Sequence, residues 1–324
     1  MAPRKAKGVM LVENLQLHPH GGLACARRGD LPALRRLVEE DSWDAHRIVD
    51  KNGSGALLWA AGAGHLHVVV YLVRQRKVDV DARNKEGRTA CHWAARGGHL
   101  RVLRWLVRAA NADLAARTKD GSSVFDWAVF GGSIPVVEWL SRRKEIDIHS
   151  CNYLGCTAIH WAGIGDSVQM CRWLHDRGVD MRTFNNSCHG IVNKAAFKGT
   201  HSLVEWLLDD PQGPQLVEQL FSLDHNGRDI IWATERGGYS ELARWLAEQK
   251  QVYLQKGWKD FNAEDLRAQQ AASKQQRLAC CAQRRSKPAA PWCLRGLALL
   301  VALGLMSRRR LALARTQQPP AAGK

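Results

Sequence analysis

The sequence predicts an all-α protein, an α-solenoid in which short helix pairs stack side by side. First, a turn glycine returns every 34 residues over part of the chain, and a tryptophan follows six residues after each one. Second, another aromatic residue comes twelve residues after that tryptophan. Third, a glycine divides each unit into two short apolar segments, and one such unit cannot bury its own apolar face. These positions are Gly53, Gly87, Gly121 and Gly155, then Trp59, Trp93, Trp127 and Trp161, then Tyr71, Trp105, Trp139 and Trp173.

The same register continues less regularly toward the C-terminus. Trp206 and Trp245 keep the second aromatic position, with Cys188 and Gly227 as turn residues, while Trp232 stands one place early. One period thus accounts for ten of the 13 tryptophans. A nucleic-acid stacking surface would not require the same two offsets in every unit. We therefore interpret these rings as core between neighbouring units.

The unit around residues 84–108 shows how the elements are expected to form. The turn 84–87 ends in glycine, and Thr89 is expected to be the N-cap of a helix over residues 90–96. A second helix is expected over residues 100–108, where apolar residues recur at helical spacing. The arginines of this second helix, which stand between its apolar residues, can reach water.

Two segments carry a likeness to a known family. They are Gly87-Arg-Thr-Ala-Cys-His92-Trp-Ala-Ala95 with the following Gly98-His-Leu100, and Gly155-Cys-Thr-Ala-Ile-His160-Trp-Ala162. They resemble the turn, the Thr-Pro-Leu-His tetrapeptide, the alanine pair and the Gly-His-Leu junction of the ankyrin repeat family. The resemblance implies an α-solenoid of stacked ankyrin-type helix-turn-helix repeats. Six units are readable from about Asp50 to Lys256, after a half-unit over Cys25–Val38.

The chain divides into four parts on this interpretation. Residues 1–13 form a basic N-terminal segment, and residues 14–256 form the repeat array, an N-terminal half-repeat plus six repeats. Residues 257–283 are expected to hold a C-terminal capping helix and linker, because the last unit of a solenoid needs an outer face that tolerates water. Residues 284–324 form a basic-apolar tail.

The chain departs from the family's pattern in three ways. The proline of the tetrapeptide is absent, which should cost local stability because its fixed φ suits the first helical turn. The resemblance implies that the histidine links neighbouring turns, and only His92 and His160 keep it, so the other junctions are expected to be weaker. About six extra residues around 209–214 are expected to bulge from the array. The replacements are Ala56, Ala90, Val124, Ala158, Ile191 and Ile230 for the proline, and Leu58, Asp126, Asn193 and Trp232 for the histidine.

Charge is divided unevenly along the chain. The formal net charge is +16, and residues 251–324 hold 14 Lys and Arg against 3 Asp and Glu, a net +11, which leaves +5 for residues 1–250. The repeat array is therefore not a polycation, and nucleic-acid binding along it is disfavoured. Any attraction to nucleic acid or anionic lipid should reside in the tail.

No signature of an enzyme or a cofactor is found. The sequence has no glycine-rich phosphate loop, no paired-histidine metal motif and no nucleophile elbow. Three cysteines and two histidines fall within 25 residues, but they are spread over a turn and separate helices, so zinc is not predicted. These are Cys151, Cys156, His160, Cys171 and His175. Nine cysteines, an odd number, and no evident signal peptide favour a reducing, cytoplasmic location.

The resemblance also implies where a partner binds. In the ankyrin family a partner usually meets the turn tips and the exposed side of the first helices. Here these positions make a mainly apolar stripe on the concave face, and we predict that a monomer binds an apolar or acidic-apolar segment of another protein there. The alternative is that Phe130, Ile164 and Phe197 turn inward and fill space left by neighbouring glycines. The partner-binding positions are Lys85, Lys119, Tyr153 and Leu154 at the tips and Arg96, Phe130, Ile164, Phe197 and Arg236 on the helices.

The tail carries a short apolar run between basic residues. The run 296–306 has 11 residues and would make a helix of about 16 Å, well short of the roughly 30 Å hydrocarbon core. Counting from residue 289, with Arg295 reaching toward the headgroups, gives 18 residues and about 27 Å, which resembles a tail anchor. The tail therefore either attaches the protein to the cytosolic face of a membrane through residues 289–306 or lacks fixed structure. The candidate membrane or anion contacts are Arg284, Arg285, Arg295, Leu299, Leu300, Arg308, Arg309 and Arg310.

Two classes of function follow from the sequence. The favoured one is a non-enzymatic adaptor that binds a partner on the concave face of its array. The alternative is a nucleic-acid or anionic-lipid binder that acts through the basic tail. Salt separates the two, because counterion release drives binding to a polyanion and contributes little to binding on an apolar stripe.

Overall fold

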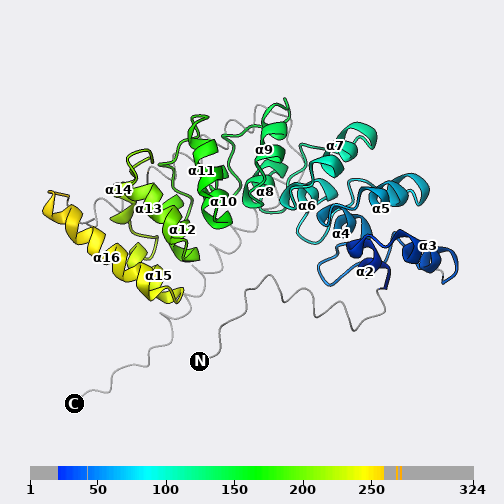
Figure 1. Cartoon of the computed structure of the whole chain (residues 1–324), viewed down its shortest axis with the longest axis horizontal. Coiled ribbons are helices and arrows are strands. Elements are labelled where there is room, and N and C mark those ends of the chain that lie inside the picture. Colours follow the sequence, from blue (N-terminus) through cyan, green and yellow to red (C-terminus); the bar gives the residue numbers. More distant parts are fainter. Residues whose placement is uncertain (1–20, 42, 259–267, 269–270, 272–324) are drawn as a thin grey trace, which may run out of the picture. The chain divides into compact units, whose positions relative to one another are not determined.

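The computed structural model describes residues 21–41, 43–258, 268 and 271, and every element named in them is a helix (Figure 1). Nearly all the helices come in pairs joined by a short turn. They are α2 (Gly21–Arg28), α3 (Leu31–Glu39), α4 (Ala56–Gly62), α5 (Leu66–Val70) with the π-helix η1 (Tyr71–Gln75), α6 (Ala90–Arg96), α7 (Leu100–Ala109), α8 (Val124–Phe130), α9 (Ile134–Ser141), α10 (Ala158–Gly165), α11 (Val168–His175), α12 (Ile191–Lys198), α13 (His201–Leu208), α14 (Val217–Leu220), α15 (Ile230–Arg236) and α16 (Ser240–Gln255).

Several parts named above lie outside the described residues. These are the basic segment 1–13, most of the capping helix and linker 257–283, and the whole tail 284–324 with Arg284, Arg285, Arg295, Leu299, Leu300, Arg308, Arg309 and Arg310. The described residues belong to the compact unit Met1–Gln275. No helix within them is long and apolar enough to cross a membrane.

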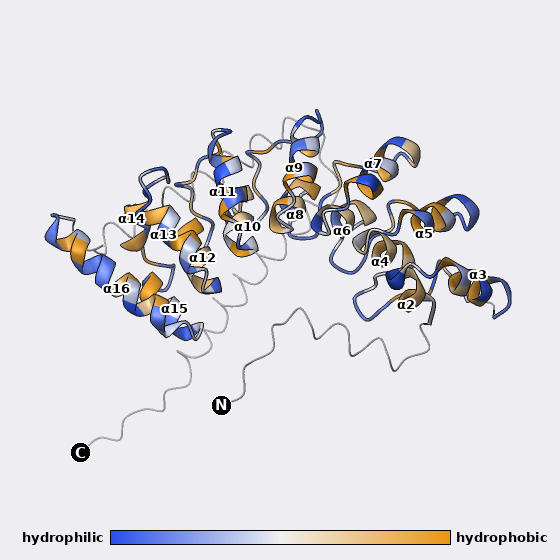
Figure 2. Cartoon of the chain, viewed as in Figure 1, coloured by the Kyte–Doolittle hydropathy of each residue, from blue (hydrophilic) through white to orange (hydrophobic). Residues whose placement is uncertain are grey.

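The predicted solenoid of helix pairs is confirmed. The first helices α2, α4, α6, α8, α10, α12 and α15 each pack against the next, and each packs against the second helix of its own unit. Alanines make this close approach possible, since Ala60, Ala61, Ala94 and Ala95 are buried between neighbouring first helices. Figure 2 shows hydrophilic residues gathered in the turns and apolar residues along the helices. Each unit thus buries the face that it could not bury alone.

The repeating tryptophans lie in the core or against it, with one exception. Trp59, Trp127, Trp139, Trp173 and Trp206 are buried, and Trp93, Trp105, Trp161 and Trp245 are partly buried and pack on the same core. Trp232 is different, because its side chain is 41% exposed. The interpretation of Trp232 as core between units is therefore wrong. Among the described residues α15 is the last first helix, so no later first helix covers the side that carries this ring.

Two first helices that lack the family's histidine, α8 and α12, keep a side-chain cap. Thr89 is the N-cap of α6 as predicted, and its N–H donates to Nδ1 of His92 at 3.2 Å. In α8 the carboxylate of Asp126 takes over, accepting from the N–H of Ser123 at 2.7 Å. In α12 the side-chain oxygen of Asn193 accepts from the N–H of Gly190 at 3.0 Å. An oxygen acceptor at this position is enough to satisfy a backbone donor at the helix start.

A ladder of backbone hydrogen bonds also joins successive turns. The N–H groups of Lys85, Lys119, Tyr153 and Asn186 donate to the carbonyls of Asn52, Glu86, Asp120 and Leu154, at 2.8–2.9 Å. The histidine adds to this ladder at one place, where Nε2–H of His160 donates to the carbonyl of His189 at 3.0 Å. The junctions that follow Leu58 and Asp126 therefore keep main-chain bonds, and the lower strength expected without the histidine stays a prediction.

The inserted residues around 209–214 only partly bulge from the array. Pro211 and Gln212 are exposed, but the following Leu216 and Leu220 are buried, and α14 packs against α12. The insertion thus ends in a third apolar segment, α14, which packs against the first helix of the same unit. Its Gln219 is 0% exposed and reaches two backbone groups, the N–H of Val192 at 3.1 Å and the carbonyl of Met181 at 3.0 Å.

Candidate functional site

The predicted partner-binding positions fall into two groups. Phe130, Ile164 and Phe197 stand at or next to the C-terminal ends of α8, α10 and α12, and we call them the helix-end patch. Tyr153 and Leu154 lie at a turn tip that precedes the N-terminus of α10, and we call them the turn-tip pair. An α-helix of eight residues spans about 12 Å, so one first helix separates the two groups. The predicted stripe is therefore two apolar areas.

None of these side chains belongs to the buried core. Phe197 is 57% exposed, Leu154 56% and Tyr153 45%, while Phe130 and Ile164 are half-buried. The alternative, in which these side chains turn inward and fill space left by glycines, does not describe Phe197, and two of the glycines lie against the backbone of the preceding first helix. A Cβ at Gly131 would lie 2.1 Å from the carbonyl oxygen of Arg96, and one at Gly165 would lie 2.9 Å from that of Phe130. Each of these glycines is needed because the preceding first helix ends against it.

Phe130 is held in place by aromatic neighbours. Its ring lies 6.4 Å from that of Trp127 and 6.0 Å from that of Trp161, both in edge-on geometry. The Arg96 guanidinium lies 5.0 Å from the centre of the same ring. Phe130 is thus fixed in orientation with one side open, whereas Phe197 projects further into solvent.

Arg96 and Arg236 do not stand as free charges beside the patch. Each lies against an indole, Arg96 at 5.6 Å from the ring of Trp127 and Arg236 at 5.8 Å from that of Trp232. At the turn tips Lys85 and Lys119 are exposed, and Nζ of Lys85 donates to the carbonyl of Lys51 at 2.8 Å. The ammonium group of Lys85 is therefore already bonded to the neighbouring turn.

Two arginines were not found by sequence reasoning. Arg88 lies 4.6 Å from the ring of Trp127, and Arg228 lies 4.2 Å from the ring of Trp232. Both residues directly follow a turn glycine, as Arg96 and Arg236 both end a first helix nine residues after it. The shared offsets were visible in the sequence, but only the structure shows that both members of a pair reach one ring.

The buried titratable groups serve the helix caps. Burial lowers the pKa of His92 and of His160 to about 3, and burial raises the pKa of Asp126 to about 6. The side chains of all three accept a hydrogen bond from the N–H of their own N-cap residue. Each of these side chains therefore uses an acceptor atom to bond a backbone N–H at the start of its helix.

Two of the cysteines considered for zinc lie in different elements, Cys156 in the turn before α10 and Cys171 in α11. Cys156, Cys171 and the other described free thiols Cys25, Cys91 and Cys188 are buried. Burial raises the pKa of Cys171 to about 12, which keeps this thiol protonated. Within the described ranges no group of His, Cys, Asp or Glu side chains could hold a metal ion.

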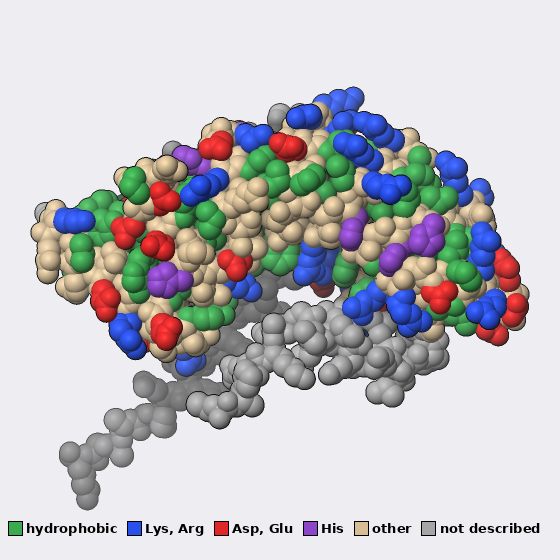
Figure 3. Space-filling model, in the orientation of Figure 1, with side chains coloured by type: hydrophobic (Ala, Val, Ile, Leu, Met, Phe, Trp, Pro, Cys, Tyr) green, Lys and Arg blue, Asp and Glu red, His purple; other side chains and the backbone are tan. Residues whose placement is uncertain are grey.

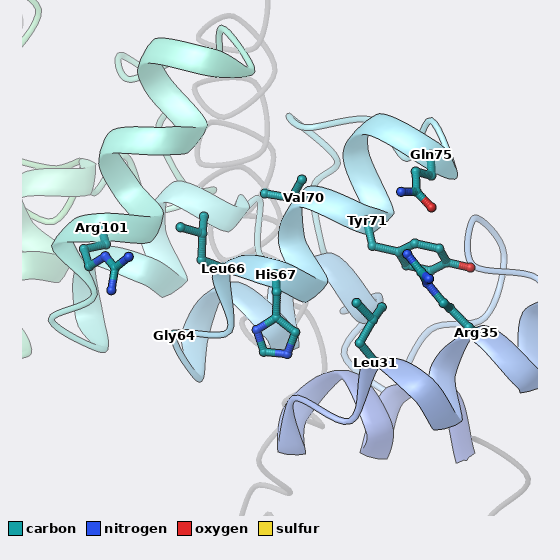
Figure 4. Close-up of a pocket in the computed structure, with 9 residues that line it drawn as sticks. All are labelled: Leu31, Arg35, Gly64, Leu66, His67, Val70, Tyr71, Gln75 and Arg101. Atoms are coloured by element: carbon teal, nitrogen blue, oxygen red, sulfur yellow. The ribbon is translucent and has the colours of Figure 1, made fainter.

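A shallow groove of about 600 Å³ lies between the second helices α3, α5 and α7 (Figure 4). Leu31, Leu66 and Val70 give it an apolar floor, and Arg35 and Arg101 lie toward its two ends. Arg35 stacks on Tyr71, with 5.2 Å between its guanidinium carbon and the ring centre. Its basic ends match the wider distribution of charge, since Figure 3 shows Lys and Arg gathered over the edge that carries α7 and α9.

Comparisons with known families and proteins complete the description of the site. A family model described as ankyrin repeats (3 copies) matches residues 23–118, and one described as ankyrin repeats (many copies) matches residues 159–208. A search of curated proteins found no match. Ankyrin repeats commonly mediate interactions between proteins, and the family is generally non-enzymatic. The repeats matched by sequence coincide with the stacked helix pairs, and this chain therefore contains ankyrin repeats in residues 23–118 and 159–208.

Proposed function

We propose that this protein is a non-enzymatic adaptor that holds an apolar or acidic-apolar segment of another protein along the helix-end patch. The observation that carries the proposal is the exposure of Phe197, 57%, beside the partly exposed Ile164 and Phe130 on the two preceding first helices. Burying a large apolar side chain gains about 1.5–3 kcal/mol relative to leaving it in water. A partner that covers the three side chains can thus draw its affinity from them.

The patch has the features of an interaction surface. Aromatic side chains in a partly desolvated setting dominate the energy of most protein interfaces. Phe130 is already oriented by Trp127 and Trp161, so binding costs it little side-chain entropy. Neighbouring helices pack roughly 8–10 Å apart, so three first helices span about 20 Å, or about six residues of an extended peptide.

A selection from random peptides tests this proposal with the full chain as bait. The selected peptides should be rich in apolar residues. Phe197→Ala should weaken their binding roughly tenfold or more, because the variant removes most of the exposed apolar area of the patch. The matched control is Val252→Ala, an exposed apolar residue on α16.

Two results would contradict the proposal. The first is that no peptide binds above background. The second is that Phe197→Ala binds the selected peptides as tightly as the unchanged chain and the control Val252→Ala do. Both variants should keep the thermal melt, since both side chains are exposed.

The charge of the C-terminal part supports a second candidate function. Residues 251–324 carry 14 Lys and Arg against 3 Asp and Glu, so this part could bind nucleic acid or an anionic membrane surface, with residues 289–306 as the membrane contact. Deleting residues 284–324 should then move the protein from membranes to the soluble fraction or abolish salt-sensitive binding to RNA. An identical distribution and identical RNA binding of the two forms would remove this candidate.

A further inference from the structure

Two arginine pairs lie on either side of the helix-end patch along the row of first helices. The first clamp is Arg88 and Arg96 on the ring of Trp127, at 4.6 and 5.6 Å. The second clamp is Arg228 and Arg236 on the ring of Trp232, at 4.2 and 5.8 Å. In both clamps one arginine directly follows a turn glycine, and the other ends a first helix.

The clamps bring like charges together. The pKa of Arg96 lies below its usual value because burial, and then the nearby Arg88, disfavour the charged form. Nε of Arg88 is buried and meets no hydrogen-bond acceptor in the described part of the chain. The aromatic ring satisfies the faces of the guanidinium groups, but the N–H donors lie in the guanidinium plane and point past the ring.

Six other arginines in the same array each lie alone on an aromatic ring, and two of them have an acidic partner. Arg172 lies 5.8 Å from the ring of Trp206 and forms a salt bridge with Asp210 at 3.3 Å. Arg177 lies 3.8 Å from the ring of Trp173 and forms one with Glu138 at 3.7 Å. In the clamps two arginines share one ring, and within the described ranges no salt bridge joins any of the four to an acidic residue. The group that the clamps lack is a carboxylate.

We propose that the two clamps bind carboxylates of one extended partner segment whose apolar middle lies on the helix-end patch. This inference rests on the proposed function and specifies the partner's chemistry: an acidic residue, an apolar stretch and a second acidic residue. Four steps of roughly 8–10 Å separate α6 from α15, so about ten extended residues lie between the two acids. The tail cannot fill this role, because residues 284–324 contain Lys and Arg but no Asp or Glu.

The peptide selection tests the clamps separately from the patch. Random peptides about sixteen residues long give room for both acids and the middle. The full chain should select peptides with an acidic residue on each side of an apolar stretch. Selection of apolar peptides without acids would overturn the clamps and leave the adaptor function standing. Selection of nothing, or binding that ignores Phe197→Ala, would overturn the adaptor function itself.

A double-mutant cycle decides whether a clamp arginine meets a peptide acid. Arg96→Gln and the change of that peptide Asp or Glu to its amide should each weaken binding roughly tenfold or more, since each leaves a charge without its partner. Made together, they should cost little more than either alone. The same cycle applies to Arg236→Gln and the second acid. The matched control is Arg104→Gln on the outer helix α7, which is exposed and should change nothing.

Arg96 also packs on Phe130, so a loss of binding could come from a displaced ring. The cycle distinguishes the two causes, because a displaced Phe130 would weaken the acidic and the amide peptide equally. Equal losses for both peptides at Arg96 and at Arg236 would overturn the proposal.

Discussion

The regular units between Asp50 and Ser187 and the longer fifth unit, which begins at Cys188, hold their neighbours by different bonds. In the regular units, backbone N–H groups such as those of Lys85 and Lys119 join each turn to the one before. In the fifth unit the chain is longer by the insertion, and the buried Gln219 reaches the backbone of Val192 and Met181 from α14. A regular repeat can rely on main-chain bonds that recur with its period, whereas an insertion needs a specific side chain.

The largest expected loss of stability comes from removing the hydrogen bonds that Gln219 makes to the backbone. Gln219→Leu removes both hydrogen bonds and leaves the N–H of Val192 and the carbonyl of Met181 without these partners. Unsatisfied buried polar groups cost about 1–3 kcal/mol each, so we expect a loss of about 4 kcal/mol in the free energy of unfolding. Urea unfolding measures it. An unchanged urea midpoint would show that the unit containing Gln219 is held to its neighbours by packing alone.

The next largest loss of stability is expected in the regular units, at the contact between α6 and α8. Gly131→Ala would place a Cβ 2.1 Å from the carbonyl oxygen of Arg96, so α6 and α8 must separate. Overpacking of this kind costs up to about 3 kcal/mol. Gly55→Ala is the control, because its Cβ would meet its nearest atoms at 3.9 Å and its φ of −84° suits any residue. Equal melting temperatures for the two variants would contradict the close approach.

A pH-dependent effect sharpens the comparison between α8 and α12. Burial raises the pKa of Asp126 to about 6, so the folded protein holds this proton more tightly than the unfolded chain. The contribution of Asp126 is therefore complete below about pH 4 and is lost as the pH rises to about 6. Asp126→Asn, which copies Asn193 of α12, should remove this dependence. Relative to wild type, the variant should gain about 2 kcal/mol between pH 4 and pH 7 in urea titrations. A difference in unfolding free energy between variant and wild type that stays constant with pH would contradict the raised pKa of Asp126.

The smallest expected effect concerns a single cap. Thr89→Ala leaves the start of α6 without its side-chain oxygen and should cost about 1 kcal/mol, measured by thermal melting. The backbone ladder at Lys85 remains, so the loss should stay local to one junction. A loss as large as that of Gln219→Leu would mean that caps, and not the ladder, hold the regular units together.

Much of the fold could be predicted because it depends on local patterns. Glycines such as Gly87 and Gly121 adopt positive φ, 75° and 82°, and their spacing marks each turn. The exposure of Trp232 could not be predicted in this way, because it depends on a later first helix, and the described residues contain none after α15. The candidate site shows the same limit: the helix-end positions followed from the register, but their separation from Tyr153 and Leu154 did not.

By itself, the sequence determined the helix pairs, their period and the family, because turn glycines and apolar spacing act over a few residues. Only the tertiary structure decided that Arg88 and Arg96 share the ring of Trp127, that Gln219 bonds the backbone of Val192 and Met181, and that Phe130 is half-buried. These outcomes depend on which atoms of one unit face the next, and no single unit contains both partners.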